Sequence, residues 1–407
     1  MSLSPSRAPT LALFCKVVDN FGDIGICWRL ARQLRSEHAI DVTLWVDDLL
    51  TFRRLCPQVL PAAAVQQVAG VTVRHWQGGA DADVAGVEVA DTVIEFFGVE
   101  LPSAYVAAMA QCTPRPVWLN LEGMSAEAWV EGCHTLPSTH PRLPLIKHFF
   151  FPGFTAHTGG LLRERGLDEA RRDFQAAQGA SAAFLADLGV SDAEQAAFKV
   201  SLFCYPHAPV AALFAAWQRS ATPITCLVPQ GVASAAVGAF LGAPAVPGAA
   251  ATRGALCVRV LPFLPQPDYD RLLWACDLNL VRGEDSIVRA QWAGRPFVWH
   301  IYPQDENLHH VKLRAFLQRF SPQLAAANAL NLRWNGALDG QQHGGGAADA
   351  DDSDGWHRTW ADYRATIAAS TERVQQWHAE MVAHGDLAAN LLRFAQTVRA
   401  ANGSAHQ

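Results

Sequence analysis

The feature of this sequence that most constrains its fold is a repeated alternation of two kinds of segment. Short apolar runs with the length of strands are each followed by a segment whose apolar positions repeat with helical period. Such alternation is typical of a parallel sheet with helices on both faces. The predicted strands form two series, residues 11–18, 42–46, 71–76, 91–97 and 115–121, and then residues 198–205, 223–229, 257–264, 276–283 and 296–303.

The two series indicate two domains. Residues 140–160 interrupt the rhythm with prolines, glycines and four phenylalanines, so we expect an irregular crossing there. The sequence therefore predicts an α/β protein with two Rossmann-like domains that face each other across a cleft. We place the first domain at residues 1–182, completed by a returning C-terminal helix at 380–407, and the second at residues 183–379. The 407 residues are half apolar, which is enough for two cores.

The composition excludes several classes of function. A net charge of −6 argues against a broad nucleic-acid surface. The nine cysteines occur singly, without the spacing of a zinc site, as expected for thiols in a reducing cytosol. The first ten residues do not resemble a signal peptide, and no apolar run reaches the ~18–20 residues that cross a bilayer. We therefore expect a soluble, cytoplasmic protein with no membrane partner. The acidic, glycine-rich residues 341–355 predict a disordered loop.

The turn KVVDNFGDIG, residues 16–25, joins the first predicted strand to the first predicted helix. It lies at the carboxyl edge of the sheet, where Rossmann-like domains bind ligands. Gly22 and Gly25 depart from the GxGxxG spacing, and Asp19 and Asp23 would repel a dinucleotide phosphate. Asp23 could simply cap the helix, and Asp19 could be a turn residue. Two carboxylates at one edge would also suit a cationic substrate, and either could act as a general base.

The second series contains the stretch LNLVRGEDSIVRAQWAGRPFVW, in which a strand, a glycine turn and a helix follow one another. Asp285 or Ser286 could cap that helix, whose first N–H groups and dipole form an anion site. Arg282 adds a cation with bidentate geometry for a diphosphate, so no metal is needed. Alternatively, Arg282 and Glu284 could pair at the surface and Ser286 could be only a cap.

Aromatic residues accompany the ends of two further predicted strands. FCYPHAP (203–209) and LPFLPQPDYD (261–270) place rings and Gln266 at these carboxyl ends. Such rings can stack on a nucleotide base, and a glutamine can read its edge with a paired donor and acceptor. Each ring taken singly could equally belong to the core.

Taken together, these motifs resemble one family, the protein-arginine rhamnosyltransferases that modify bacterial elongation factor P (EarP). The resemblance covers nearly the whole chain. It rests on VVDNFGDIGICWRLARQL, HFFFPGFTAHTGGLLRE, LFCYP and PFLPQPDYDRLLWACDLNLVRGEDSIVRAQWAGRPFVWHIYPQDENLHHVKL, in that order. It implies a GT-B glycosyltransferase fold and an inverting reaction without metal or other cofactor. The donor would be dTDP-β-L-rhamnose, and the acceptor partner would be one arginine of elongation factor P.

The resemblance also assigns residues. It implies that Asp23 is the general base and that Asp19 and Glu284 are important for activity. Donor contacts would fall on Asn20, Phe21, Gly22, Asp23, Tyr205, Gln266, Arg282, Gly283, Glu284, Asp285 and Ser286. Whether Glu284 holds a rhamnose hydroxyl or positions Arg282 is left open. The alternatives are a GT-B enzyme with another nucleotide sugar or acceptor, and a non-catalytic sensor of nucleotide sugars.

Overall fold

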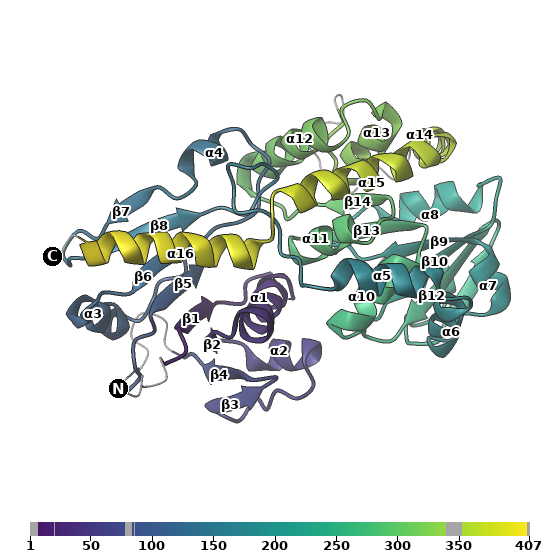
Figure 1. Cartoon of the computed structure of the whole chain (residues 1–407). Coiled ribbons are helices and arrows are strands. Elements are labelled where there is room, and N and C mark those ends of the chain that lie inside the picture. The colour runs from purple at the N-terminus through teal and green to yellow at the C-terminus, as the bar shows by residue number, and fades with distance from the viewer. Residues whose placement is uncertain (1–6, 20, 78–83, 85, 339–351, 405–407) are drawn as a thin grey trace. The chain divides into compact units, whose positions relative to one another are not determined.

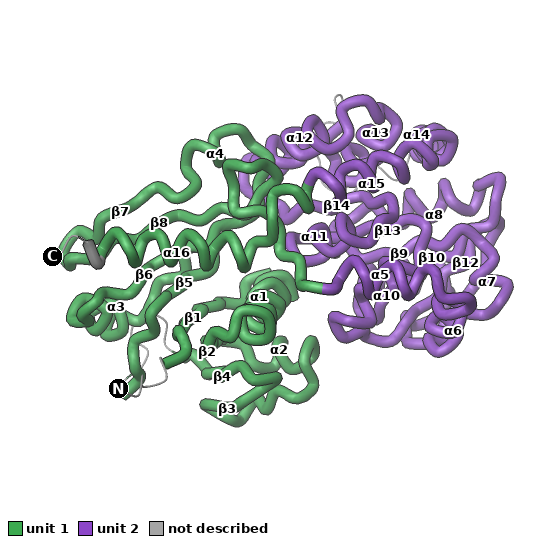
Figure 2. Tube along the Cα trace, in the orientation of Figure 1, with its two compact units in different colours: residues 1–165, 381–407 green, residues 166–380 purple. Residues whose placement is uncertain are grey.

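The computed structural model describes residues 7–19, 21–77, 84, 86–338 and 352–404. The chain forms two compact units (Figure 2). The first comprises Met1–Arg165 and Met381–Gln407, and the second comprises Gly166–Glu380.

The division lies earlier in the chain than residue 182, where the sequence predicted it. Residues 166–182 belong to the second unit, because this segment packs there. The side-chain amide of Gln175 donates hydrogen bonds to the carbonyl oxygens of Trp274 and Ala293, at 3.1 and 3.3 Å. The ring of Phe174 meets that of Trp274 edge-on, with 5.7 Å between the centroids.

The first unit is built on a mainly parallel sheet with the strand order β3-β4-β2-β1-β5-β6-β8-β7 (Figure 1). Its strands are β1 Thr10–Cys15, β2 Asp41–Val46, β3 Val65–Val68, β4 Val71–His75, β5 Thr92–Phe96, β6 Val117–Leu121, β7 Pro137–Thr139 and β8 Ile146–Phe150. Its helices are α1 Gly22–His38, α2 Leu49–Leu55, α3 Ser103–Gln111, α4 Trp129–Cys133 and α16 Leu387–Ser404. Among the strands that the structure describes in this unit, only the outermost ones, β3 and β7, pair with their neighbours in antiparallel fashion.

Strand β1 shows why this sheet is covered on both faces. Its residues alternate between two cores, since Leu13 packs with α1, α2 and α16, whereas Phe14 packs with α3. Side chains of successive strand residues point to opposite faces, so a run in which all of them are apolar belongs in the middle of a covered sheet.

The second unit contains a sheet with the order β11-β12-β10-β9-β13-β14. Its strands are β9 Phe198–Leu202, β10 Ile224–Pro229, β11 Ala250–Arg253, β12 Leu256–Leu261, β13 Leu278–Arg282 and β14 Phe297–His300. Its helices are α5 Leu167–Ala176, α6 Ala180–Asp187, α7 Asp192–Ala196, α8 Val210–Gln218, α9 Ser234–Leu241, α10 Gln266–Ala275, α11 Asp285–Trp292, η2 Asp305–Asn307, α12 Leu308–Phe320, α13 Ala325–Trp334, α14 Ser353–Ala365 and α15 Ile367–Ala383.

All ten predicted strands are present, and four others were missed. The expectation of an irregular crossing at residues 140–160 was wrong in part, because β8 lies within it and pairs in parallel with β6. Prolines precede and follow this strand instead of interrupting it, so its backbone donors remain available.

Of the predicted loop at 341–355, residues 341–351 lie outside the described part. Asp352 and its successors instead begin α14, where the Asp352 carboxylate accepts the backbone N–H of Gly355 at 3.0 Å.

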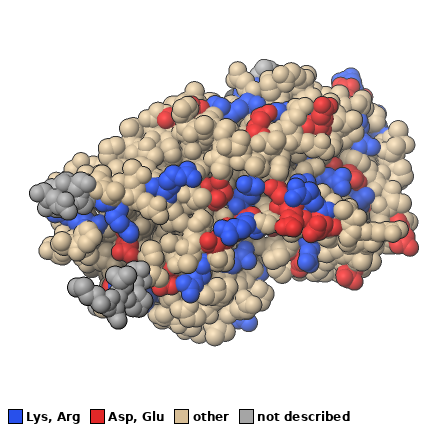
Figure 3. All heavy atoms as spheres, in the orientation of Figure 1, with Lys and Arg blue, Asp and Glu red and all other residues tan. Residues whose placement is uncertain are grey.

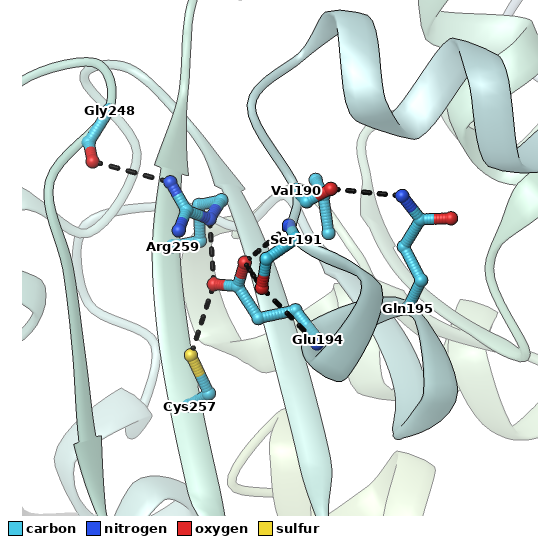
Figure 4. Close-up of polar contacts among 7 residues, drawn as sticks. All are labelled: Val190, Ser191, Glu194, Gln195, Gly248, Cys257 and Arg259. Carbon is cyan, nitrogen blue, oxygen red and sulfur yellow. Dashed lines mark hydrogen bonds and ion pairs between the residues drawn. The ribbon is translucent and has the colours of Figure 1, made fainter.

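Helix α7 is fastened to β12 by a compact polar network (Figure 4). Ser191 and Glu194 form a capping box, in which the Glu194 carboxylate accepts the backbone N–H of Ser191 at 2.7 Å. The same carboxylate accepts a hydrogen bond from Arg259 Nε at 2.7 Å. Burial alone would raise the pKa of Glu194, but the hydrogen bonds from Arg259 and Ser191 outweigh it and lower the pKa to about 2.

The charged surface agrees with the balance of the composition. On the face drawn in Figure 3, Lys and Arg are interspersed with Asp and Glu, and they do not gather into one basic surface. No helix in the described ranges combines the length and the apolar character that a membrane crossing requires.

Candidate functional site

The turn between β1 and α1 is organised by the buried carboxylate of Asp23. Asp23 is the second residue of α1 and is 4% exposed. Its Oδ2 atom accepts the backbone N–H groups of Val18 at 2.7 Å and of Asp19 at 2.8 Å. The sequence offered Asp23 as a helix cap, but the N-cap residue is Phe21, without a side-chain bond. Asp23 instead reaches back and fixes the segment that enters the helix.

Asp19 lies in the same turn, half-buried. Its carbonyl oxygen accepts the N–H of Gly22 at 2.7 Å, which closes the turn. A Cβ atom at position 22 would approach the Asp19 Oδ2 atom to 2.8 Å, so the glycine makes room for this carboxylate. The structure therefore brings Asp19 and Asp23 together. Asn20 lies outside the described residues, and the ring of Phe21 lies 5.1 Å from the guanidinium carbon of Arg54.

Two thiols near this turn are unsuited to nucleophilic chemistry. Burial, with a contribution from Asp23, raises the pKa of the Cys15 thiol and raises that of Cys27 well above its ordinary value. A thiol held in its neutral form is a poor nucleophile. The carboxylates are thus the groups that give this turn its chemical character.

The second unit has its topological switch point between β9 and β13. Strands β10 and β12 lie on one side of β9, and β13 and β14 lie on the other, all running in parallel. Open α/β sheets bind ligands beyond the carboxyl ends of the strands at such a point. Tyr205, which follows β9, and Arg282, which ends β13, are therefore at the edge where a ligand is expected.

Arg282 is held on two aromatic rings. Its guanidinium carbon lies 4.5 Å from the ring centroid of Phe203 and 4.9 Å from that of Tyr205. Its Nη1 atom donates to the carbonyl oxygen of Cys204 at 3.3 Å. These contacts hold the guanidinium group at the end of the strand.

The turn from β13 into α11 follows the predicted order of residues but uses different contacts. Gly283 has a φ of 61°, and its carbonyl oxygen accepts the Trp299 indole N–H at 2.8 Å. The sequence suggested that Asp285 or Ser286 caps the helix. Neither does, because the N-cap residue is Glu284. Ser286, which is 4% exposed, reaches back: its Oγ accepts the Arg282 N–H at 3.2 Å and donates to the Arg282 carbonyl.

Glu284 has a partner that the sequence did not suggest. Its carboxylate lies 2.9 Å from the ammonium of Lys312 on α12, and both side chains are largely buried. The sequence allowed a surface pair between Glu284 and Arg282, but in the structure Arg282 packs on the two aromatic rings and Glu284 pairs with Lys312. The pair therefore balances one of the two acidic charges at the start of α11.

Gln266 and His300 complete this edge of the sheet. Gln266 begins α10, directly after Pro265, and is 4% exposed. His300, at the end of β14, was missed by the sequence reasoning, although the predicted strand contained it. Its Nδ1 accepts the Tyr205 backbone N–H at 3.1 Å. Burial, and then the nearby His207 and Arg282, lower the pKa of His300 well below its ordinary value, so the ring is a neutral acceptor.

The chain matches a family of known proteins over most of its length. Residues 11–396 match the model of the Elongation-Factor P (EF-P) rhamnosyltransferase EarP. A protein-arginine rhamnosyltransferase of Pseudomonas putida is 47% identical over 391 residues, which cover 95% of this chain and 98% of that protein.

Solved structures agree with this match. One, described as the structural basis for EarP-mediated arginine glycosylation of translation elongation factor EF-P, is 34% identical with a TM-score of 0.63. The match covers 95% of this chain and 99% of the chain in that structure. A glycosyltransferase from Rickettsia africae shares the fold, with a TM-score of 0.51, although it is only 7% identical. The match covers 96% of this chain and 98% of the chain of that protein.

Proposed function

Because this chain belongs to the EarP family of elongation factor P rhamnosyltransferases, we propose that it transfers L-rhamnose from dTDP-β-L-rhamnose to an arginine side chain of elongation factor P. The chain is a glycosyltransferase with the GT-B fold of two Rossmann-like units. The proposal adds three finer statements: the donor is the dTDP sugar, the anomeric configuration is inverted, and no metal ion takes part. Such a reaction on a translation factor belongs in the cytoplasm.

The observation that best supports the proposed binding of the sugar donor is the position of Arg282. This guanidinium lies at the switch point of the second unit, next to the start of α11. An arginine and a helix N-terminus together supply fixed positive charge and N–H donors for a diphosphate. The same groups would stabilise the diphosphate as it leaves, without a metal ion. Tyr205 and Gln266 would contact the nucleoside.

The acceptor half rests on Asp19 and Asp23. An acceptor arginine is protonated at neutral pH and is a weak nucleophile. In the proposed step, a guanidinium nitrogen forms a bond to the anomeric carbon while the bond from that carbon to the diphosphate oxygen breaks. Asp19 orients the guanidinium, and Asp23 accepts the proton that the nitrogen loses. The hydrogen bonds from Val18 and Asp19 to Oδ2 of Asp23 hold this carboxylate in the turn.

One experiment separates this proposal from its alternatives. The protein is incubated with dTDP-β-L-rhamnose and elongation factor P, and the mass of the intact acceptor is measured. A gain of one deoxyhexose on an arginine supports the proposal, a different sugar or acceptor supports another GT-B transferase, and no modification supports a sensor. Activity that survives a chelator supports the metal-independent reaction. An NMR measurement of the linkage formed tests inversion.

A further inference from the structure

A polar cavity lies in the second unit, at the opposite edge of the sheet from Arg282. It has a volume of about 470 Å³ and opens where β9, β10, β13 and β14 begin. Its charged lining residues are Lys199, Asp277, Arg295 and Arg364, and two hydroxyl side chains, Thr222 and Thr371, also line it. Three of the four charges are positive, although the chain as a whole is acidic.

Lys199 and Asp277 largely satisfy each other. The ammonium of Lys199 lies 3.0 Å from the Asp277 carboxylate and also donates to two backbone carbonyl oxygens of the segment before β9. The net positive charge of the cavity therefore comes from the two arginines.

Arg295 has a buried guanidinium nitrogen. Its Nε atom has no hydrogen-bond partner, a property that it shares with the Nε atoms of Arg32, Arg163, Arg171 and Arg333. Arg171 and Arg333 each have a carboxylate partner, Asp168 and Asp352. Among the residues that the structure describes, no carboxylate lies within ion-pair distance of Arg295.

Arg364 presents its charge differently. Its guanidinium carbon lies 3.7 Å from the ring centroid of Phe198, so an aromatic face supports the cation. Burial lowers the pKa of Arg364, which means that its charge has lost part of its hydration. Within the described ranges, no carboxylate lies at ion-pair distance from Arg364, although the charge of Asp277 is near enough to oppose the lowering of its pKa. Bound anions gain most from such partly dehydrated donors.

We propose that this cavity is a binding site for a small phosphate-bearing molecule, distinct from the donor site. Arg295 and Arg364 would hold the phosphate, and the threonine hydroxyls would accept or donate further hydrogen bonds. A volume within the usual range for small-molecule pockets favours a compact ligand over a nucleic-acid backbone. Strand β13 begins at this cavity and ends at Arg282. Such a ligand would therefore bind at the first residues of a strand whose last residue lies at the proposed donor site.

The test uses inorganic phosphate as the probe with the full-length protein. Phosphate should raise the thermal unfolding midpoint relative to chloride at matched ionic strength, because a ligand that binds only the folded state stabilises it. The double variant Arg295→Gln/Arg364→Gln should bind phosphate about tenfold more weakly or worse by calorimetry, since charge-assisted hydrogen bonds are lost. Arg295→Lys/Arg364→Lys should retain part of the affinity. Arg219→Gln, an exposed arginine of the same unit, should match the wild type.

Two results would overturn the assignment. One is a phosphate response that disappears in Arg282→Gln but persists in the double glutamine variant, which would place the ion at the donor site. The other is no phosphate response in any protein. If the double variant fails to fold, as judged by near-ultraviolet circular dichroism, Arg295→Gln alone replaces it, because Arg295 loses no ion pair on substitution.

Discussion

Each unit has a hydrogen bond that joins a side chain at the start of a helix to the backbone just before that helix, and the residues held by these bonds, Asp19 and Arg282, carry opposite charge. In the first, Asp23, the second residue of α1, bonds back to the N–H of Asp19, four residues earlier. In the second, Ser286, the second residue of α11, bonds back to the N–H of Arg282, also four residues earlier. Each side chain fixes the segment between a strand end and a helix start. What differs is the reaching side chain and the residue that it holds: a carboxylate that holds Asp19 in one turn, and a hydroxyl that holds Arg282 in the other.

This difference teaches how one architecture can bind opposite charges. A helix N-terminus attracts anions. At α1 that attraction falls on the protein's own Asp23, so the turn can receive a cation. At α11 the reaching side chain is a neutral hydroxyl, and the residue that it holds is the cation Arg282. Lys312 offsets the charge of Glu284, so Asp285 is the remaining acidic residue of this turn, and we assign Arg282 and the first N–H groups of the helix to an anion from outside. Four predictions test this account, from the largest expected effect to the smallest.

The largest effect should follow from removing the charge of Asp23. Asp23→Asn keeps an oxygen that can accept the N–H groups of Val18 and Asp19, so the turn should persist. Transfer of rhamnose should fall by about a hundredfold or more, as expected when a general base is lost. The dissociation constant of dTDP should stay within a few-fold, because Arg282, Tyr205 and Gln266, to which we assign the diphosphate and the nucleoside, are in the other unit. Intact-mass kinetics and calorimetry measure the two quantities.

Asp47→Asn is the matched control for Asp23. The Asp47 carboxylate accepts the backbone N–H of Val17 at 2.8 Å, so it holds the same segment but is given no chemical role. It should retain nearly full activity. Equal losses in the two variants would mean that Asp23 acts only by fixing the turn, and full activity of Asp23→Asn would remove it as the base.

The second effect should appear in donor affinity. Arg282→Ala should weaken dTDP binding by about tenfold to a hundredfold, the usual range for a hydrogen bond to a charged group. Ser286→Ala should weaken it only a few-fold, because the hydroxyl is engaged with the Arg282 backbone. Arg271→Ala, an exposed arginine on α10, is the control. Calorimetry showing unchanged affinity in Arg282→Ala would remove this residue from the donor site.

A smaller effect should reveal what Glu284 does. Lys312→Met leaves the Glu284 charge unbalanced beside the site of the diphosphate, and should weaken dTDP binding by about three- to tenfold. Lys312→Arg should restore most of the affinity. Glu284→Gln/Lys312→Met should also restore binding, since both charges are gone.

The transfer rate of that double variant then separates two roles of Glu284. Restored affinity with lost transfer indicates that Glu284 contacts the rhamnose or the acceptor. Restoration of both indicates that its charge only needs to be balanced. Affinity that stays low in the double variant would contradict the compensation argument.

The sequence predicted the framework well, and the reason is physical. Buried parallel strands are continuous apolar runs, and the helical period between them is readable without tertiary contacts. The predicted runs were too long at their functional ends: β1 stops at Cys15 and not at Val18, and β9 stops at Leu202 and not at Tyr205. The apolar residues beyond these ends leave the sheet and shape the turns, which hydrophobicity alone does not distinguish.

The partners of the site residues were harder to predict. Lys312 is 28 residues from Glu284, and His300 is 95 from Tyr205, so only the fold brings these pairs together. The strands missed at the sheet edges were short and polar, as with β3 and β11, and lacked an apolar run. Residue types and spacing thus indicated which turns matter, whereas the contacts within them required the structure.

The smallest expected effect is on the stability of α7. This helix also begins with a side chain that bonds back to the preceding segment, but we propose no ligand there. In α7, Glu194 bonds back to the N–H of Ser191, and Arg259 balances its charge. Glu194→Gln should lower the unfolding midpoint by about 2–4 °C at neutral pH, as expected for about 1 kcal/mol in a unit of this size. Rhamnose transfer should be unchanged.

The pH dependence gives this last prediction its sign. Hydrogen bonding lowers the pKa of Glu194 to about 2, from the ordinary value of 4.5. The stabilisation is therefore present above about pH 4.5 and is lost as the pH falls toward 2. The difference in midpoint between the wild type and Glu194→Gln should shrink over that interval, while Asp192→Asn, an exposed neighbour in α7, should show no such change. A difference independent of pH would mean that the charge of Glu194 is not what holds α7 in place. A loss of transfer in Glu194→Gln would contradict the purely structural role assigned to this residue.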